Sequence, residues 1–191
     1  LFQYCQLFKT DIVLLQETHS KIDDEKLWKQ EWGNEIMFSH GTNHSAGVAI
    51  LKNKNMTDVN IKNIECDKKG RYILMEVDMT GSNITIGNVY APNDDRGQEM
   101  FYAHLHQLLQ TKYTSSHTLI GGDFNLYLNH SLDKKGGIPR NRLALDKVKD
   151  MIFQMNLVDI WRKMNPNKKK YTWPARVNPP VACRLDYWLI S

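Results

Sequence analysis

The run with the most chemical information is Gly121-Gly122-Asp123-Phe124-Asn125, which follows a short apolar segment. Two adjacent glycines let a backbone turn sharply and let a ligand approach closely. Asp123 and Asn125 are two residues apart, so their side chains project to the same side if the extended conformation continues. There the Asp could activate a water, and the Asn could orient that water or a phosphate. Taken alone, the motif is explained equally well as a glycine turn closed by Asp and Asn hydrogen bonds.

Other polar residues stand where predicted strands end, which is where open α/β sheets usually place their sites. They are Glu17, Tyr90 with Asn93, and Asp186. Hard divalent cations such as Mg²⁺ bind carboxylate and amide oxygens and keep water ligands, so one Glu with neighbouring Asp and Asn residues is suitable ligand chemistry. The sequence has no nucleophile-elbow, Cys-His or phosphate-loop pattern. Each residue taken singly is better explained by a structural role, and only their convergence favours metal-assisted hydrolysis.

Short strands and a few helices would have to position these residues. Apolar residues alternate with polar ones at 72–79 and 83–90, and the turn signal Gly81-Ser82 joins the two segments into an antiparallel hairpin. Apolar spacing predicts helices over 97–112 and 143–155, and the tail of another over 1–9. Further strands are predicted at 11–16, which we expect to be covered on both faces, and at 35–40, 46–52, 117–120 and 185–190. This pattern favours an α/β fold of two packed sheets flanked by helices.

Length and composition fit one ordinary soluble domain. The chain has 191 residues, a formal charge of +4 and 41% hydrophobic residues. Its three cysteines have no paired or metal-ligand spacing, which argues for thiols in a reducing compartment. There is no signal-peptide pattern and no run near the 18 or so apolar residues that a membrane span requires. We therefore expect an intracellular protein without a membrane segment.

The lysines at 168–170 run directly into Tyr171 and Trp173. Basic residues interleaved with aromatic ones suit a phosphate backbone with an exposed base or groove edge. A solvated loop explains the charge run equally well, so the charges alone do not identify a partner.

Four ordered motifs together resemble the endonuclease/exonuclease/phosphatase superfamily, which includes apurinic/apyrimidinic (AP) endonucleases and pancreatic deoxyribonuclease. The motifs are Leu15-Gln16-Glu17-Thr18-His19, Asn88-Val89-Tyr90-Ala91-Pro92-Asn93, Gly121-Gly122-Asp123-Phe124-Asn125 and Arg184-Leu185-Asp186-Tyr187. Within the superfamily, the chain is similar to the endonuclease domain of non-long-terminal-repeat (LINE-type) retrotransposon polyproteins. The segments at 157–162 and 170–173 look like that group's later landmarks. The resemblance covers essentially the whole chain and implies a four-layered α/β/β/α sandwich of two mixed sheets flanked by helices.

The resemblance also implies catalytic roles. Glu17 corresponds to the Mg²⁺ ligand, with Mn²⁺ as a possible substitute, and Tyr90 to a hydroxyl that contacts the scissile phosphate. Asp123 would activate the attacking water or assist the leaving oxygen, with Asn125 beside it. Asp186 corresponds to a carboxylate that orients a catalytic His.

Contacts to DNA are implied at three further positions, namely Asn93, Thr172 and Arg184. For Arg184 the sequence leaves two alternatives open, a phosphate contact or an ion pair with a carboxylate. The implied function is a nuclear, monomeric, Mg²⁺-dependent endonuclease that nicks double-stranded DNA. The new 3′-hydroxyl would prime reverse transcription, with element RNA and a reverse-transcriptase domain as partners in the parent polyprotein.

Two parts of the family pattern are missing between Leu1 and Ser191. The opening strand, with its Asn before a glycine turn, and the closing Ser-Asp-His segment, with the catalytic His, are both absent from the sequence. We therefore interpret residues 1–191 as one domain that lacks its first strand and its last Ser-Asp-His strand. None of the seven histidines replaces the catalytic His, because each is better interpreted as a surface or packing residue. Losing a catalytic His costs roughly two to four orders of magnitude in rate, so we expect the chain alone to be nearly inactive. We also expect it to fold poorly, because the missing strands would leave sheet edges unpaired.

Two other functions remain open on the sequence. The chain could be a non-catalytic relic that only binds nucleic acid, which would show salt-dependent binding without Mg²⁺-dependent turnover. Alternatively, it could be a phosphatase or phosphodiesterase of the same superfamily, although the substrate loops of such enzymes are not found in the sequence.

Overall fold

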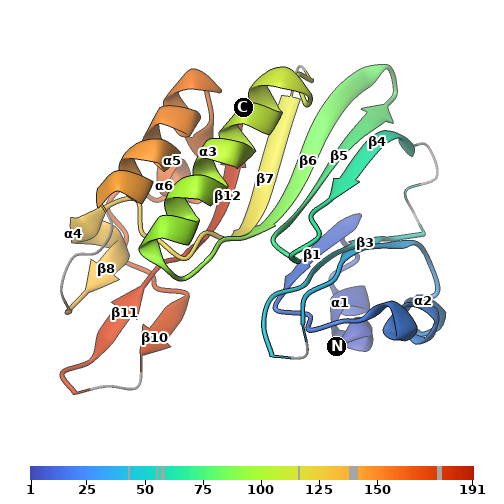
Figure 1. The fold of residues 1–191 in the computed structure, drawn as a ribbon, viewed down its shortest axis with the longest axis horizontal. Helices are drawn as coiled ribbons and strands as arrows, with labels where there is room; N and C mark the ends of the chain where they lie inside the picture. The colour runs from blue at the N-terminus through green and yellow to red at the C-terminus, as the bar shows by residue number, and fades with distance from the viewer. Residues whose placement is uncertain (43, 55, 57–58, 116, 138–141, 176–177) are drawn as a thin grey trace. The chain divides into compact units, whose positions relative to one another are not determined.

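The computed structural model describes residues 1–191 except 43, 55, 57–58, 116, 138–141 and 176–177 (Figure 1). The chain divides into two compact units, Leu1–Tyr90 and Ala91–Ser191. Each unit has its own strands and helices, and each is described by itself.

The first sheet of the N-terminal unit is built around β3 (Val48–Lys52). This strand pairs antiparallel with β1 (Ile12–Gln16) on one side and with β2 (Ile36–Ser39) on the other. Its side chains alternate between two cores, with Val48 and Ile50 on one face and Ala49 and Leu51 on the other. The strand that is fully covered on both faces is therefore β3. The same expectation for residues 11–16 is confirmed as to packing, because side chains of β1 pack alternately against both cores. They are only half-buried, however, since β1 is at the end of the strand order.

The second sheet of this unit consists of β4 (Val59–Cys66), β5 (Tyr72–Met79) and β6 (Ser82–Tyr90), all antiparallel. The predicted hairpin over 72–90 is confirmed as β5 and β6. Apolar side chains of this sheet, including Ile73, Val77 and Ile86, pack with Val48 and Ile50 of the first sheet. This packing forms the core between the two sheets.

A buried amide on β6 crosses the core of the N-terminal unit. Asn88 is fully buried, and its Nδ2 donates to the backbone oxygens of Leu15 and Ala49, each at 2.9 Å. Its Oδ1 accepts from Nε2 of Gln16 at 2.7 Å. Because buried polar groups require such partners, these bonds fix the register of the two sheets immediately before Glu17.

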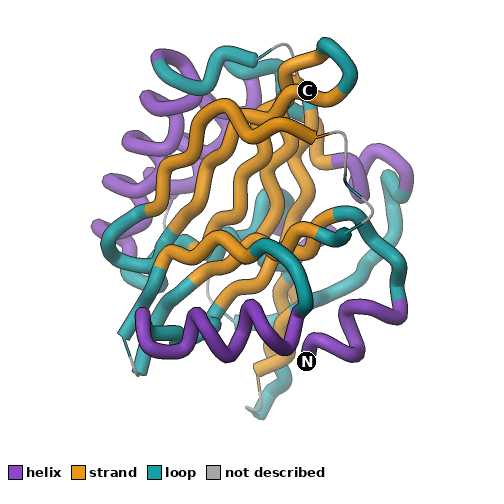
Figure 2. Tube along the Cα trace, turned by 90° about the vertical axis from the view of Figure 1, so that its right-hand side faces the viewer, coloured by secondary structure: helices purple, strands orange, loops and turns teal. Residues whose placement is uncertain are grey.

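Two short helices cover the outer face of the first sheet, α1 (Phe2–Leu7) and α2 (Glu25–Trp32), the latter preceded by the 3-10 turn η1 (Ile22–Asp24) (Figure 2). Their aromatic residues meet there, with the rings of Phe2 and Trp28 5.3 Å apart. Sequence reasoning identified α1 but not α2, because charged residues surround the two tryptophans of α2. It also missed β4.

The central sheet of the C-terminal unit has the order β7 (His117–Asp123), β12 (Asp186–Ile190) and β9 (Val158–Asp159), with antiparallel pairing throughout. Helices α3 (Asp95–Thr111) and α5 (Arg142–Gln154) pack against each other and lie over this sheet (Figure 1). Tyr102 of α3 stacks on Phe124, just beyond β7, and its hydroxyl donates to the Phe124 backbone oxygen. The apolar stripe of α3 thus fixes the segment that carries Asp123 and Asn125.

A second, small sheet of this unit joins β10 (Trp173–Ala175), β11 (Val181–Cys183) and β8 (Lys134–Lys135). Two short helices, α4 (His130–Asp133) and α6 (Ile160–Met164), complete the unit. None of these short elements was predicted, because two to five residues carry too little periodicity.

The mixed α/β fold and the long elements are confirmed. The helices predicted at 97–112 and 143–155 are α3 and α5, and the last strand is β12. The strand predicted at 117–120 continues to Asp123, so Gly121 and Gly122 lie within β7 opposite Trp188 and Tyr187 rather than in a turn. No described helix combines the length and apolarity that a membrane crossing requires.

His106 on α3 predicts a pH dependence of stability. Within the described structure its Nε2 is buried without a hydrogen-bond partner. Burial lowers the pKa of His106 below its ordinary value of 6.5, against the opposing effect of Asp150 on α5, with Lys147 of α5 lowering it further. The unfolded chain therefore takes up this proton more readily, and the stability present above the ordinary pKa is lost as the pH falls through the folded-state value.

We expect His106→Leu to reduce the fall in the free energy of unfolding between pH 7.5 and pH 5, measured by denaturant titration. His104→Leu, at an exposed position of the same helix, is the control and should keep the wild-type slope. Equal slopes for His106→Leu and the wild type would contradict this prediction.

Candidate active site

Glu17 and Tyr90 meet in the N-terminal unit, where β1 and β6 end. The phenol of Tyr90 donates to Oε1 of Glu17 at 2.6 Å. Tyr90 is buried, and the Arg71 guanidinium lies 5.1 Å from its ring centroid, whereas Glu17 is exposed. The hydroxyl of a buried tyrosine therefore orients a carboxylate that remains accessible to solvent.

The turn that carries Glu17 has an unusual backbone conformation. Glu17 and His19 have φ values of 52° and 50°, in the left-handed region that costs a side-chain-bearing residue about 1–2 kcal/mol. Between them, the Thr18 N–H donates to Gly47 O at 3.1 Å, and the His19 N–H donates to Ala46 O at 3.1 Å. A Cβ at Gly47 would lie 2.4 Å from Thr18 Oγ1, so only glycine permits this close approach. The surrounding structure thus imposes the conformation that presents Glu17.

Asp123 and Asn125 lie together in the C-terminal unit, but not as strand neighbours. Extended structure ends at Asp123, and Asn125 has a left-handed backbone with φ of 49°. The Asn125 N–H donates to Asp123 Oδ1 at 2.8 Å, and its Nδ2 donates to Ala91 O at 2.7 Å. The expectation of two side chains on one face of a continuing strand was wrong. An Asp-turn hydrogen bond brings the two residues together instead.

Asp123 and Asp186 are direct neighbours across β7 and β12. Residues directly opposite each other on antiparallel strands share a face, and like charges there destabilise the sheet. Asp186 is exposed, and its N–H, like that of Leu185, donates to Thr172 Oγ1. Two carboxylates held at one end of a sheet favour a cationic or proton-donating partner between or beside them.

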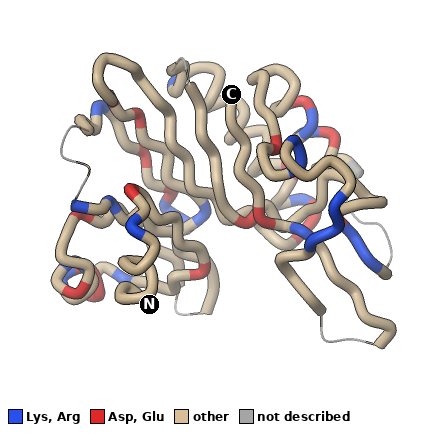
Figure 3. The backbone as a smooth tube through the Cα atoms, turned by 180° about the vertical axis from the view of Figure 1, so that it is seen from behind, with Lys and Arg blue, Asp and Glu red and all other residues tan. Residues whose placement is uncertain are grey.

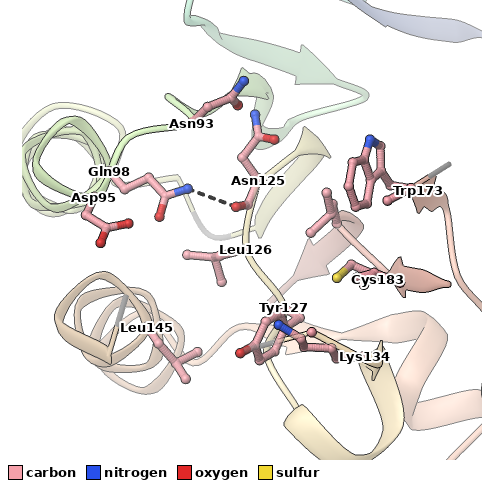
Figure 4. Close-up of a pocket in the computed structure, with 14 residues that line it drawn as sticks. Asn93, Asp95, Gln98, Asn125, Leu126, Tyr127, Lys134, Leu145, Trp173 and Cys183 are labelled. Atoms are coloured by element: carbon pink, nitrogen blue, oxygen red, sulfur yellow. Dashed lines mark hydrogen bonds between the residues drawn. The ribbon is translucent and has the colours of Figure 1, made fainter. Parts of the chain in front are cut away.

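A pocket of about 470 Å³ adjoins Asn125 (Figure 4). Its wall includes Asn93 and the exposed Trp173, which comes from β10. Tyr127 and Lys134 also line it, with the Lys134 ammonium 4.9 Å from the Tyr127 ring centroid. The wall thus offers amides, an exposed aromatic face and a cation, together with the Asp95 carboxylate and apolar side chains, which suits a ligand that has both a flat ring and polar groups.

Of the two alternatives for Arg184, a phosphate contact or an ion pair with a carboxylate, the structure shows the ion pair. Its guanidinium is buried and donates to Asp133 from Nε at 2.8 Å and to Asp159 from Nη2 at 2.5 Å. Burial opposes its charge, but the hydrogen bonds to Asp159 and Asp133 outweigh that effect and raise its pKa. Arg184 therefore stabilises the start of β12 from the interior. The expectation that Arg184 contacts DNA is contradicted, because its guanidinium is buried. Nη2 of Arg162 also donates to Oδ1 of Asp133, at 2.5 Å.

The exposed cations of the C-terminal unit lie elsewhere. The lysines at 168–170 are exposed and precede Thr172 and Trp173 in the sequence. Figure 3 shows how basic and acidic residues are distributed along the backbone. Thr172 itself is exposed, and its hydroxyl oxygen accepts the two N–H bonds that lead into β12. Asn93 and Thr172 thus lie at the accessible surface of their unit, and their contact with DNA stays a prediction.

Sequence reasoning missed two buried residues that support the site. Gln98 of α3 donates from Nε2 to the backbone oxygens of Asn125 and Pro92, at 2.8 and 2.9 Å. It lies on the same helical stripe as Phe101 and Tyr102, and a polar residue on an apolar stripe was the available signal. Asp133 carried no such signal, because its two arginine partners are distant in sequence.

This arrangement of strand-end carboxylates on a mixed α/β fold agrees with the family to which the chain belongs, the Endonuclease/Exonuclease/phosphatase family, whose model matches residues 1–191. Solved structures share the fold. An AP endonuclease of Leishmania major superposes with a TM-score of 0.76 at 16% identity, covering 99% of this chain and 72% of that one. The catalytic domain of APE2 of Xenopus laevis gives 0.74 at 19% identity, with 99% and 76% coverage.

The chain is also similar to a transposon protein. It is 29% identical over 164 residues to the transposon TX1 uncharacterized 149 kDa protein of Xenopus laevis. The match covers 85% of this chain but only 12% of that protein, so it concerns a small part of the relative.

The pairing of Asp123 with Asp186 across β7 and β12 predicts that repulsion between their carboxylates lowers the free energy of unfolding. Asp186→Asn removes the repulsion with Asp123, so we expect the free energy of unfolding to rise by about 0.5 kcal/mol at neutral pH and low salt. The gain should shrink in 1 M NaCl, where exposed charges are screened. Denaturant titrations at both salt concentrations measure it.

Asp23→Asn, at an exposed position without a carboxylate partner across a strand, serves as the control and should change little. A loss of stability in Asp186→Asn, or a gain that does not depend on salt, would count against repulsion between the two carboxylates.

Proposed function

We propose that this protein is a Mg²⁺-dependent phosphodiester hydrolase that nicks one strand of double-stranded DNA, as part of a transposon-encoded protein. Members of its family are hydrolases acting on phosphodiester bonds. The similarity to a transposon protein supports an origin in a mobile element. A Neisseria relative of the same fold, described as a 3′ phosphatase, has been solved with a product DNA hairpin, which supports a DNA substrate.

The observation that carries the proposal is the facing of Asp123 and Asp186 across β7 and β12, with Asn125 beside an open pocket. A structural role explains this pair poorly, because two carboxylates directly opposite each other repel and so destabilise the sheet. Phosphodiester hydrolysis needs an activated water and stabilised charge on the leaving oxygen, for which carboxylates near a bound phosphate are suited.

The chemistry of the donors fits a magnesium ion that keeps most of its waters. In the described ranges of the chain, no group of three or more His, Cys, Asp or Glu side chains forms a metal cage. Mg²⁺ commonly binds through one or two carboxylates together with waters and substrate phosphate, so an exposed, oriented Glu17 is an adequate protein ligand. When bound, the ion would polarise the phosphate and offset its negative charge.

The protein's own residues would then divide the remaining work. Tyr90 directs its single proton to Glu17 and so orients the ligand carboxylate. The phosphate contact implied by the resemblance would require the same proton to turn from Glu17 to a phosphate oxygen. Asp123, whose Oδ1 accepts from the Asn125 N–H, would accept a proton from the attacking water. Asn93 and Trp173 line the pocket where a nucleotide beside the cleaved bond could lie, with Trp173 offering a stacking surface. Thr172 lies next to Trp173 at the surface that would face DNA.

The cellular setting follows from this proposal. A nick in chromosomal DNA requires a nuclear site of action, and the 3′-hydroxyl it leaves would prime reverse transcription by a domain of the same parent polyprotein. Element RNA would be the template.

The test is nicking of supercoiled plasmid DNA in Mg²⁺ by the protein expressed with the sequence that flanks it in its reading frame. We expect Glu17→Gln and Asp123→Asn each to lower the nicking rate by about 100-fold or more. Glu31→Gln and Asp23→Asn are matched controls at exposed positions and should nick at the wild-type rate. The 191-residue chain alone should be far slower than the extended protein.

Two results would overturn the proposal. One is nicking by Glu17→Gln and Asp123→Asn at the wild-type rate. The other is salt-dependent DNA binding without nicking in Mg²⁺ or Mn²⁺, which would instead support the non-catalytic alternative. Rapid nicking by the 191-residue chain that is lost in Asp123→Ala would support the activity but refute the expected need for a catalytic His.

A further inference from the structure

A chain of side-chain hydrogen bonds runs from the turn that carries Glu17 into the N-terminal unit. Thr18 Oγ1 lies 3.0 Å from Ser20 Oγ, and Ser20 Oγ lies 3.1 Å from Nδ1 of His40. Nε2 of His40 lies 3.1 Å from Oε1 of Glu25. The chain thus connects Thr18, the neighbour of Glu17, with helix α2.

The chemistry of its members gives the chain a direction. The Glu25 carboxylate can only accept, so Nε2 of His40 donates to it. In a neutral imidazole, Nδ1 then accepts from the Ser20 hydroxyl, and the Ser20 oxygen in turn accepts from the hydroxyl of Thr18. Every proton has one place in this arrangement, which fixes the rotamer of Thr18.

The order Ser20, His40, Glu25 is that of a hydrolase triad, but the surroundings exclude that role. Ser20 is 1% exposed, so no substrate reaches its oxygen. That oxygen is also engaged on two sides, by Thr18 and by His40. The chain therefore acts on the turn rather than on a substrate.

The far end of the chain is itself held in place. The ring of His40 stacks on Phe38 with centroids 5.3 Å apart and planes at 19°. Glu25 accepts from Nζ of Lys29 at 2.6 Å. These contacts make His40 a rigid support for Ser20 and, through it, for Thr18.

Thr18 is consequently clamped between two supports. Its side chain lies against Gly47, where a Cβ would come within 2.4 Å of Oγ1, and its hydroxyl is bonded to Ser20. The residues on either side of it, Glu17 and His19, are both in the left-handed region. A turn with two such residues persists only where the surroundings determine it strongly.

We propose that His40 is a positioning residue for the Glu17 carboxylate, acting through Ser20 and Thr18. This inference rests on the proposed role of Glu17 as the Mg²⁺ ligand. Groups that hydrogen-bond a metal ligand directly affect metal affinity by about 10-fold to 100-fold when they are removed. His40 acts through two intervening residues, so we expect the lower end of that range. Loss of the imidazole should therefore weaken metal binding at Glu17, although His40 does not touch the ion.

Mn²⁺ binding to the protein expressed with its flanking sequence tests the inference, with free Mn²⁺ measured by electron paramagnetic resonance. The Glu17-dependent site is the binding present in the wild type and absent in Glu17→Gln. His40→Leu should weaken that site about 10-fold. Metal-free thermal unfolding of each variant shows whether the fold is retained.

Two conservative variants separate positioning from general packing. In His40→Asn the amide lies near the place of Nδ1 and can still accept from Ser20, so Mn²⁺ affinity should return to within about 3-fold of the wild type. In His40→Gln the amide reaches toward Glu25 but leaves Ser20 without its acceptor, so affinity should stay low.

The outcomes distinguish this inference from the proposed function. If Glu17→Gln abolishes the site but His40→Leu binds as the wild type does, the positioning role is overturned and the proposed function stands. If all three His40 variants lose affinity in proportion to their unfolding temperatures, His40 is only structural and the inference is again overturned. If Glu17→Gln binds Mn²⁺ as the wild type does, the proposed role of Glu17 fails, and the inference fails with it.

Discussion

Two polar side chains on β6 connect the sheets of the N-terminal unit, and the geometry of Glu17 depends on them. Asn88 and Tyr90 are two residues apart, so both project from the same face of the strand toward β1. Asn88 bonds Leu15 and Gln16 at the end of β1, and Tyr90 bonds Glu17 one residue further on. The same face of β6 thus fixes the register of the two sheets and the direction of an accessible carboxylate.

The C-terminal unit differs in that it holds two like charges close together. Asp123 and Asp186 face each other at the end of β7 and β12, and the buried Arg184 lies two residues before Asp186. That guanidinium is bonded to Asp133 and Asp159, so it stabilises the backbone that leads into β12. The ion pairs of Arg184 thus stabilise the start of β12 from the interior, while Asp123 and Asp186 remain neighbours at the end of the sheet.

The sequence predicted the parts of this architecture that follow from periodicity. The β5–β6 hairpin has alternating apolar residues, and α3 has a clear apolar stripe, so both were found. The strand-end position of Glu17 and Tyr90 was equally readable, because it needs only the ends of elements. What could not be predicted depends on contacts between distant residues: the hydrogen bond from Tyr90 to Glu17, the carboxylate partners of Arg184, and the left-handed backbone that turns Asn125 back toward Asp123. Helix α2 was missed for a local reason, since Trp28 and Trp32 are hidden among charged residues.

The central claim is that Glu17, oriented by Tyr90, is the point at which the protein binds its divalent ion. The most direct measurement is anomalous diffraction from crystals of the protein grown with Mn²⁺. We predict an anomalous peak within coordination distance of the Glu17 carboxylate, with Tyr90 still bonded to that side chain. A Mn²⁺ ion bound elsewhere in the protein, with Glu17 bonded only to Tyr90, would contradict the account.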